Sequence, residues 1–327
     1  MRVLITGATG FVGGYLAGEI AAREPATEIW GTAHGRSHVV ASAPGGTATD
    51  AVRLIAGDLT DPAFTAQVVE TVRPDRVYHL AGFASGAGTD REGIFAANVT
   101  VTGELLRLLS RAGRPCRVLL ASSGYVYGAT RAGRPAREED PLTPSGAYAE
   151  SKVAMEEAAR RVADETDVLE VTVARAFNHT GPRQTADFVV PAFAAQIAEI
   201  ERGQAPPRLR VGNLDARRDF LDVRDVVRAY RMLLDGGGAP YRVVNVASGV
   251  AVTIRAILDT LLREARVPLA VETDPARLRP SDIPECVGDP SRLVALTQWK
   301  PEFPLEATLR DTLSYWRDQP SVPRAAA

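Results

Sequence analysis

The sequence predicts an α/β protein with a doubly wound parallel sheet in its first half and a smaller, mostly helical C-terminal lobe. Three observations predict this fold class. Apolar strand-like runs alternate with helix-like segments up to about residue 178, as in repeated βαβ units. The strand-like runs are apolar almost throughout, which is typical of strands covered on both faces. After residue 178, prolines become frequent and the remaining helix-like segments stand apart.

The individual elements follow from local patterns. Strands are expected at residues 2–6, 28–33, 52–59, 76–82, 116–123, 169–178 and 241–248. An amphipathic helix is expected directly after the first strand, and others at residues 92–112, 146–164, 189–202, 253–265 and 304–317. A further helix is expected after Asp61, because aspartate is a favourable N-cap and Pro62 suits the first helical position.

The composition excludes several classes of protein. The 327 residues are 45% hydrophobic and 24% charged, with a formal net charge of −2, so nothing favours nucleic acid or an anionic membrane as a partner. No apolar run reaches the ~18 residues of a transmembrane helix. Cys116 and Cys286 make neither a disulfide framework nor a metal site, so no metal is expected. The first strand leaves no room for a signal peptide, and the cytoplasm is the expected location.

A glycine-rich turn follows the first strand. "GATGFVGG" places Gly7, Gly10 and Gly13 three residues apart, directly before a helix. Glycines allow a tight turn there, and the helix N-terminus offers free N–H groups to a pyrophosphate. We therefore assign Gly7, Gly10, Phe11, Val12 and Gly13 to the binding of a dinucleotide. The alternative is a plain strand-to-helix turn.

The end of the second strand indicates which nicotinamide cofactor binds. An acidic residue there would hydrogen-bond the ribose 2′-OH of NAD. Here His34 and Arg36 follow the strand instead, and positive groups suit the 2′-phosphate of NADP(H). Alternatively, Arg36 is a solvated loop residue. Asp58, with Leu59 beside it, either reaches the adenine amino group or caps a turn.

A tyrosine and a lysine stand four residues apart, at positions 148 and 152. The chain has eight tyrosines and only two lysines, so about 0.05 such pairs are expected by chance. Both side chains face the same side of a helix, and a nearby ammonium would lower the pKa of the Tyr148 phenol. Such a tyrosine can exchange a proton with a sugar or alcohol oxygen. Ser123, at the carboxyl end of a strand, can hydrogen-bond the same oxygen. The alternative is a surface tyrosine.

Seven segments spread over most of the chain form a recognisable set: "TGATGFVGG", "GDL", "HLAG", "NVTVTGELL", "ASSGYVYG", "YAESK" and "RAFNHTGP". Together they resemble the extended short-chain dehydrogenase/reductase family. The resemblance implies a Rossmann-type fold, a bound nicotinamide cofactor, and Ser123, Tyr148 and Lys152 as the catalytic triad. Lys152 would also hold the nicotinamide ribose. Ala81, Gly82 and Asn98 would contribute to cofactor binding.

The loosening of the strand and helix pattern after residue 178 predicts a division into domains. Residues 1–177 are expected to form the NADP(H)-binding Rossmann domain, with residues 222–248 returning to it. Residues 178–221 and 249–320 are expected to form the nucleotide-sugar-binding lobe. The resemblance implies a homodimer, formed through the helix after Asn98 and the helix that carries Tyr148.

Segments of the second half narrow the substrate. "FNHTGPRQ", "VGNLDARRDFLDVRDV" and "RLRPSDIPECVGD" resemble the GDP-mannose branch of the family, which holds 4,6-dehydratases and 4-keto-6-deoxy-sugar reductases. The resemblance implies that Asn178 touches the diphosphate, that Arg218 and Arg279 neutralise it, and that Asp282 binds the nucleotide ribose. Arginine forks fit phosphate oxygens. For Arg218, an ion pair with Asp219 is the alternative.

One position separates the two reactions. In the dehydratases a glutamate lies two residues after the serine or threonine of the triad, where it takes the C5 proton and helps to expel the C6 hydroxyl. In this chain Tyr125 occupies that position. Without the carboxylate, elimination loses a factor of about 10²–10⁴ in rate. We therefore expect NADPH-dependent reduction of a GDP-4-keto-6-deoxyhexose to GDP-D-rhamnose or GDP-6-deoxy-talose. Tyr125 either lines the sugar pocket or serves packing.

Three other functions remain as alternatives. A GDP-mannose 4,6-dehydratase would recycle tightly bound NADP⁺ and turn over GDP-mannose without added NADPH. A 4-epimerase would also recycle its cofactor, and such enzymes more often carry an acid after the second strand. A non-catalytic dinucleotide sensor on the same fold would usually lose the tyrosine or the lysine, and this chain keeps both.

Overall fold

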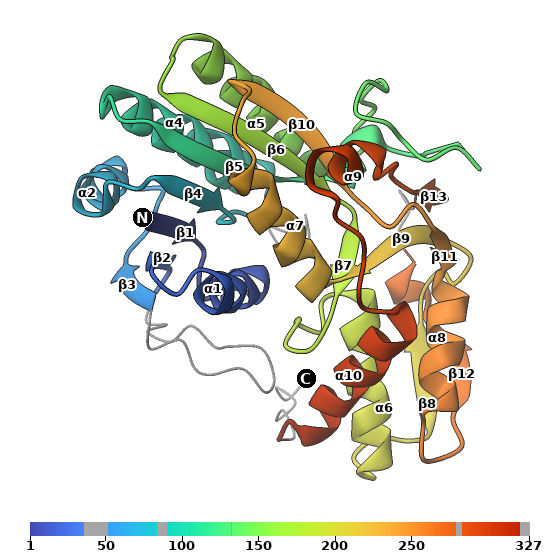
Figure 1. Ribbon diagram of the computed structural model, residues 1–327. Helices are drawn as coiled ribbons and strands as arrows, with labels where there is room; N and C mark the ends of the chain where they lie inside the picture. The colour runs from blue at the N-terminus through green and yellow to red at the C-terminus, as the bar shows by residue number, and fades with distance from the viewer. Residues whose placement is uncertain (36–51, 84–89, 132, 279–282, 321–327) are drawn as a thin grey trace.

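The computed structural model describes residues 1–35, 52–83, 90–131, 133–278 and 283–320. These residues form a seven-stranded parallel sheet covered by helices on both faces, with a smaller lobe beside it (Figure 1). Among them, no helix is both long and apolar enough to cross a membrane.

The large sheet has the strand order β10-β6-β5-β4-β1-β2-β3, and all neighbours are parallel. Its strands are β1 (Arg2–Thr6), β2 (Glu28–Ala33), β3 (Val52–Ala56), β4 (Arg76–His79), β5 (Cys116–Ser123), β6 (Leu169–Ala176) and β10 (Tyr241–Val246). The chain order reverses between β1 and β4. In open α/β sheets, ligands bind outside the carboxyl ends of the strands at such a switch point.

Two apolar cores hold the helices against this sheet. One core joins the sheet to α1 (Phe11–Arg23), α7 (Val223–Asp235) and α9 (Ser291–Thr297). The other joins the opposite face to α2 (Pro62–Val72), α4 (Val101–Arg111) and α5 (Ala147–Asp164). Burial on both faces explains the nearly unbroken apolar strands, and it confirms the predicted fold class.

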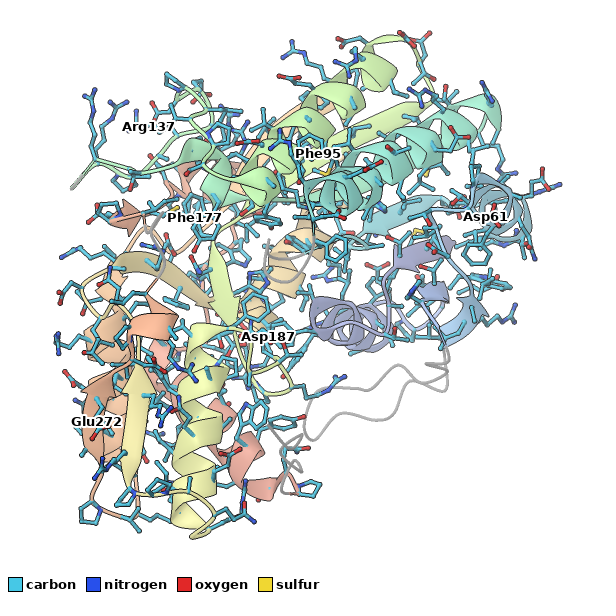
Figure 2. The ribbon with its side chains drawn as sticks, turned by 180° about the vertical axis from the view of Figure 1, so that it is seen from behind. Asp61, Phe95, Arg137, Phe177, Asp187 and Glu272 are labelled. Atoms are coloured by element: carbon cyan, nitrogen blue, oxygen red, sulfur yellow. The ribbon has the colours of Figure 1, made fainter. Side chains whose placement is uncertain are left out.

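Local signals placed several element ends correctly. Asp61 caps α2 as expected, because its Oδ1 accepts a hydrogen bond from the Ala63 N–H at 2.9 Å, and Pro62 is the first helical residue. Figure 2 shows the layers from behind, with Asp61 at α2 on one side and Glu272 on the lobe on the other.

Several predicted elements differ in the structure, among them the strand expected at 52–59, which ends at Ala56. The strand expected at 169–178 is divided: β6 ends at Ala176, and β7 (Asn178–Thr180) joins another sheet. The helix expected at 92–112 consists of α3 (Arg91–Phe95), a π-helical turn η1 (Ala96–Thr100) and α4. The strand expected at 76–82 ends at His79, and the next two N–H groups, of Leu80 and Ala81, donate to the Thr6 side chain instead of to a neighbouring strand.

The lobe surrounds a third apolar core. Its helices α6 (Val189–Glu201), α8 (Ile254–Arg263) and α10 (Leu305–Asp318) agree with the expected helical content. The structure adds short strands that the sequence did not predict. β7, β9 (Arg217–Asp222), β11 (Ala251–Thr253) and β13 (Glu285–Cys286) form one sheet, and β8 (Arg208–Val211) pairs with β12 (Ala270–Thr273).

The chain returns from the lobe to the large sheet. After β9, α7 packs against α1, and β10 then pairs with β6 at the edge of the large sheet. The domain boundaries themselves stay a prediction.

Candidate active site

The glycine turn connects β1 to α1 at the switch point. Gly7 has a φ of +69°, and its carbonyl accepts a hydrogen bond from the Gly10 N–H at 3.0 Å. A Cβ at Gly13 would overlap this carbonyl oxygen and lie 2.8 Å from the Ala8 Cα. Helix α1 has no capping side chain at Gly10 and no acid in its first turn, where Phe11 and Val12 lie. The turn therefore leaves its helix N-terminus accessible to an anionic group.

The residues expected at the adenosine end follow β2 and β3. His34 is exposed, and Asp58 and Leu59 stand after the neighbouring strand. Asp58 Oδ1 accepts a hydrogen bond from the Thr60 N–H at 2.9 Å, so Asp58 caps a turn. This bond lowers the pKa of the Asp58 carboxyl, and the nearby His34 acts in the same direction. Arg36 lies outside the described residues.

Ala81 and Gly82 follow β4 and lie against Asn98. A Cβ at Gly82 would overlap the Asn98 Oδ1, which accepts a hydrogen bond from the Phe83 N–H at 3.0 Å. Asn98 is 1% exposed and lies in the π-helical turn η1. Its Nδ2 donates to the Ser151 Oγ at 2.9 Å, and the Ser151 hydroxyl donates to the Tyr148 carbonyl at 2.7 Å. Asn98 thereby connects the loop after β4 to the first turn of α5.

A buried hydrogen-bond chain that we did not predict continues from Asn98 to the glycine turn. The Thr6 Oγ1 accepts from the Leu80 and Ala81 N–H groups, both at 3.1 Å, so its own proton is available to the His79 Nδ1 at 2.8 Å. His79 Nε2 then donates to the Thr102 Oγ1 at 2.9 Å, and Thr102 donates to the Asn98 carbonyl at 2.7 Å. This order of donors requires a neutral His79 protonated on Nε2. In the sequence, only the segment "HLAG", which contains His79, Leu80 and Ala81, pointed to this chain of hydrogen bonds.

The structure brings Ser123, Tyr148 and Lys152 together. Ser123 ends β5, and Tyr148 lies in the first turn of α5, where the two side chains form a hydrogen bond. The Lys152 Nζ lies 5.9 Å from the centroid of the Tyr148 ring and donates to the Ala121 carbonyl at 2.9 Å. Their catalytic roles stay a prediction.

Burial decides the protonation of this group. It raises the pKa of Tyr148 to about 12, and the hydrogen bond with Ser123 only partly opposes it. Burial lowers the pKa of Lys152 to about 8, against the opposing charge of Glu156. The expectation that the lysine lowers the phenol pKa is therefore not met. The reason is that desolvation of the phenol is the largest influence on its pKa, and Lys152 is not among the groups that shift it.

Three residues expected at the substrate meet next to Ser123. Tyr125 lies in the 3₁₀ turn η2 (Gly124–Tyr127), and its hydroxyl oxygen accepts from Asn178 Nδ2 at 3.4 Å and from Arg218 Nε at 3.3 Å. The Arg218 guanidinium lies 5.9 Å from the centroid of the Tyr125 ring. Arg279 and Asp282 lie outside the described residues.

The alternative of an Arg218–Asp219 ion pair does not occur. Asp219 is fully buried, and its Oδ1 accepts from the Ser248 N–H at 2.8 Å and the Ser248 hydroxyl at 2.6 Å. Its Oδ2 accepts from the Gly249 and Gly288 N–H groups at 2.9 and 3.3 Å. Asp219 thus joins β9 to two loops instead of neutralising its neighbour.

One further residue links the cofactor side to the lobe. The His179 ring in β7 stacks on the Phe11 ring at the start of α1, with centroids 6.3 Å apart and planes inclined by 6°. Burial lowers the pKa of His179. His179 belongs to the segment "RAFNHTGP", but nothing in the sequence indicated its contact with Phe11.

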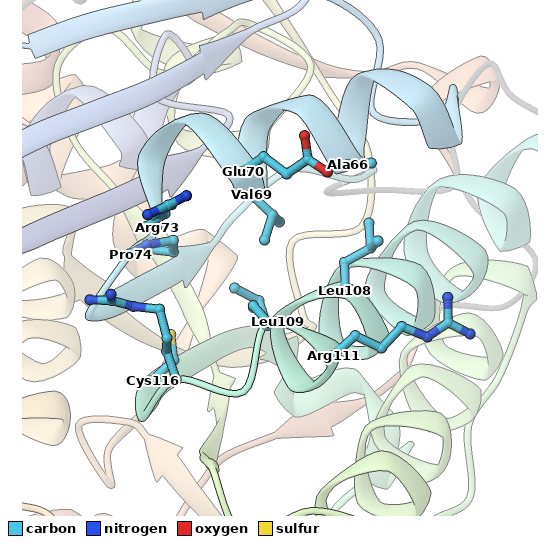
Figure 3. A pocket seen from close by; sticks show the side chains of 11 residues that line it. Ala66, Val69, Glu70, Arg73, Pro74, Leu108, Leu109, Arg111 and Cys116 are labelled. Atoms are coloured by element: carbon cyan, nitrogen blue, oxygen red, sulfur yellow. The ribbon is translucent and has the colours of Figure 1, made fainter.

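A pocket of about 490 Å³ lies away from this site. It is bounded by α2, α4 and the start of β5, with Val69, Leu108 and Leu109 at its base and Arg73 and Arg111 at its margin (Figure 3). The start of β5 is the end of the strand opposite to Ser123, so the pocket is not part of the candidate active site.

Comparisons with known proteins show what this chain is similar to. A family model described as GDP-mannose 4,6 dehydratase matches residues 4–312. A GDP-6-deoxy-D-mannose reductase from Pseudomonas aeruginosa is 35% identical over 321 residues, which cover 97% of this chain and 98% of that protein. A GDP-mannose 4,6-dehydratase from Vibrio cholerae is 26% identical over 349 residues, covering 93% and 91%. The solved structure of RMD from Pseudomonas aeruginosa complexed with NADPH is 34% identical with a TM-score of 0.80, covering 97% and 100%.

Proposed function

The chain belongs to the GDP-mannose 4,6 dehydratase family, and from this premise we propose that it uses NADPH to reduce the C4 ketone of a GDP-4-keto-6-deoxyhexose. The product is a GDP-6-deoxyhexose, either GDP-D-rhamnose or GDP-6-deoxy-talose. The enzyme is therefore an NAD(P)-dependent oxidoreductase of the short-chain dehydrogenase/reductase type.

Tyr125 is the observation that carries the choice of reaction within the family. Dehydration needs a carboxylate beside Ser123, and this position holds a phenol hydrogen-bonded to Asn178 and Arg218. Reduction of a ketone needs no such base. The higher identity to the reductase than to the dehydratase, 35% against 26%, supports the same choice.

The residues of the site fit NADP(H). The Gly7–Gly13 turn has no room for a Cβ at Gly13, and its uncapped helix start suits a diphosphate. His34 offers an exposed imidazole to the 2′-phosphate, and Lys152 and Tyr148 would lie at the nicotinamide ribose. When bound there, NADPH supplies the hydride for C4.

The protein supplies the proton and the orientation of the ketone. Ser123 and Tyr148 hold the C4 oxygen between them, and Tyr148 gives its proton to this oxygen as the negative charge develops. A phenol with a pKa of about 12 is fully protonated at neutral pH, which suits a proton donor. Lys152 stabilises the phenolate that remains.

The polar residues beside Ser123 bind the rest of the substrate. Arg218 and Asn178 contact the diphosphate, and Tyr125, whose hydroxyl accepts hydrogen bonds from both, lines the sugar pocket. Contacts of Arg279 and Asp282 with the nucleotide belong to the same proposal. The homodimer and the cytoplasmic location stay predictions.

A panel of substrates tests the proposed reaction. Purified protein is mixed with 4-keto-6-deoxy sugars linked to GDP, UDP or dTDP, with NADPH or NADH, and oxidation of the cofactor is followed by absorbance. We expect oxidation of NADPH with the GDP-linked ketone, and analysis of the product identifies the C4 epimer. Consumption of GDP-mannose without added reductant would indicate the dehydratase instead.

Replacement of the phenol tests the proton donor. Tyr148→Phe should lower kcat by about 10²–10⁴-fold, because no other group donates to the C4 oxygen with the same geometry. NADPH binding, measured by fluorescence titration, should change little. An equal loss of cofactor affinity would mean that Tyr148 binds the cofactor and does not act as the acid.

A further inference from the structure

Three hydrogen bonds connect the end of β5 to successive turns of α5. Ser123 bonds Tyr148, Ala121 accepts from Lys152, and the Ser122 hydroxyl donates to Glu156 Oε1 at 2.5 Å. Tyr148, Lys152 and Glu156 follow one another at intervals of four, so they lie along one face of the helix. Two of these contacts involve the predicted catalytic residues. The third involves a glutamate to which the proposed mechanism gives no role.

Glu156 belongs to a buried ion pair. Glu156 is 4% exposed and Arg175 on β6 is 5% exposed. Arg175 Nη2 donates to Glu156 Oε2 at 2.6 Å, and Arg175 Nε lies 3.1 and 3.2 Å from the two carboxylate oxygens. The Glu156 carboxylate therefore accepts hydrogen bonds from two side chains, those of Ser122 and Arg175.

Arg175 extends this contact to the segment after Ser123. Its Nη1 donates to the Tyr127 hydroxyl at 2.8 Å and to the Glu138 carbonyl at 3.2 Å. Tyr127 ends the 3₁₀ turn that carries Tyr125, and its hydroxyl donates to Asn245 Oδ1 at 2.8 Å. One ion pair therefore connects α5, β5, β6 and the turn beside the substrate.

Stability alone is a poor explanation for this pair. Replacing a buried ion pair by apolar residues of similar volume is often neutral or stabilising, because desolvating two charges costs about as much as their attraction returns. The pair lies one helical turn from Lys152, and its hydroxyl partner is adjacent to Ser123.

We propose that Glu156, held by Ser122 and Arg175, is a positioning residue of the active site that fixes Lys152 and keeps it charged. The proposal rests on the function proposed above for the Ser123–Tyr148–Lys152 group. The negative charge of Glu156 opposes the effect of burial on the Lys152 pKa. The other titratable or charged groups that face this pair or Lys152 are Tyr127, Tyr148, Tyr241, Glu138, Arg160 and His79.

The scarcity of lysine permits a direct test. The chain has only Lys152 and Lys300, so lysine labelled with ¹³C at Cε gives two NMR signals, and Lys152→Met assigns them. The exposed Lys300 serves as an internal reference. In the cofactor-free protein, Glu156→Gln should lower the pKa of Lys152 by about one unit, because burial then acts unopposed. Glu157→Gln, an exposed neighbour on the same helix, is the matched control and should leave both signals unchanged.

Activity provides the second measurement. Glu156→Gln should lower kcat by about 10- to 100-fold through misplacement of Lys152, and shift the alkaline limb of its pH profile to lower pH. Glu157→Gln should behave like the wild type. If Glu156→Gln does not fold, Glu156→Gln with Arg175→Met removes both charges and is measured in the same way.

An unchanged Lys152 titration together with an unchanged pH profile would overturn the proposal and leave Glu156 a structural residue. The titration needs no substrate. If the wild type reduces none of the ketones tested, the proposed function fails while the titration still decides the role of Glu156.

Discussion

Burial controls protonation at individual residues of the site more strongly than charge does. Tyr148 keeps its proton and Lys152 holds its own less firmly than a free lysine, and in both the first cause is loss of hydration. His79 follows the same rule. Its pKa is lowered to about 3 by burial, with the charge of Lys152 acting in the same direction. The neutral imidazole is also the form that its two hydroxyl partners require.

His79 should make the stability of the protein depend on pH. An unfolded histidine has a pKa near ~6.5, so below this pH the unfolded chain binds a proton that the folded chain does not. The free energy of unfolding should therefore fall by about 1.4 kcal/mol per pH unit between pH ~6.5 and the folded pKa of about 3. Urea unfolding of the wild type and of His79→Gln at pH 7, 6 and 5 measures this slope.

The difference between the two proteins isolates His79, since other groups contribute equally to both. We expect the wild type to lose more stability than His79→Gln on each step towards pH 5. Parallel slopes would mean that the folded protein accommodates a charged His79.

At the level of single residues, the sequence predicted which residues form the site better than it predicted how their surroundings shift their pKa values. A tyrosine and a lysine four residues apart are rarely expected by chance in this chain, so the spacing of Tyr148 and Lys152 indicated a function. Their proximity to Ser123 follows from the helix and strand on which the three residues lie. The sequence did not predict the direction of the Tyr148 pKa. Desolvation depends on every neighbour that excludes water, and most of these neighbours are remote along the chain.

Among the elements, signals confined to a few residues predicted helix and strand starts well. The cap at Asp61 and the start of β5 are local features. The division of the strand expected at 169–178 was not local. The residues on both sides of Phe177 are strand-like, but Asn178 pairs with Phe220 more than forty residues later and so leaves the large sheet. The short strands of the lobe escaped prediction for the same reason.

Two glycines of α1 allow a controlled test of the turn that precedes it. Gly13→Ala should destabilise the protein by about 1–3 kcal/mol, because the new Cβ meets backbone atoms of Gly7 and Ala8 that cannot easily move. It should also weaken NADPH binding at least tenfold by displacing the helix start. Gly18→Ala has no heavy atom within 4 Å of its Cβ and should stabilise the helix by about 0.5–1 kcal/mol.

Thermal unfolding and NADPH fluorescence titration measure both variants. Equal NADPH affinity in Gly13→Ala and Gly18→Ala would show that close packing at Gly13 is not needed for the cofactor.

In the whole molecule, the candidate active site combines residues of the large sheet with residues of the four-stranded sheet formed by β7, β9, β11 and β13, here called the small sheet. Ser123, Tyr148 and Lys152 belong to β5 and α5 of the large sheet, while Asn178 and Arg218 belong to the small sheet. The first group was predicted from the spacing of Tyr148 and Lys152 and from the position of Ser123 at the end of a strand. The second group was predicted only through family resemblance, because the small sheet combines strands from four separate parts of the chain.

Asp219 should determine how firmly Asn178 and Arg218 are held beside the site residues of the large sheet. Its buried carboxylate accepts four hydrogen bonds from Ser248, Gly249 and Gly288, which tie β9 to loops beside the large sheet. Asp219→Asn has the same shape but only one acceptor oxygen, so donors at the other oxygen lose their partner. The free energy of unfolding should fall by about 1–3 kcal/mol. Since Arg218 is the preceding residue of the same strand, KM for the GDP-linked ketone should rise, while the Kd for NADPH should stay near the wild-type value.

Asp215→Asn is the matched control, because Asp215 lies just before β9 with a side chain that is 86% exposed. Urea unfolding gives the stability, steady-state kinetics give KM, and fluorescence titration gives the Kd. If Asp219→Asn matched Asp215→Asn in stability and KM, β9 would be held by its strand partners alone. If KM and the NADPH Kd rose together, the carboxylate would support the whole molecule rather than the placement of Arg218. A rise in KM alone requires that the lobe and the large sheet bind the two reactants through separate contacts, with Asp219 on the side of the sugar nucleotide.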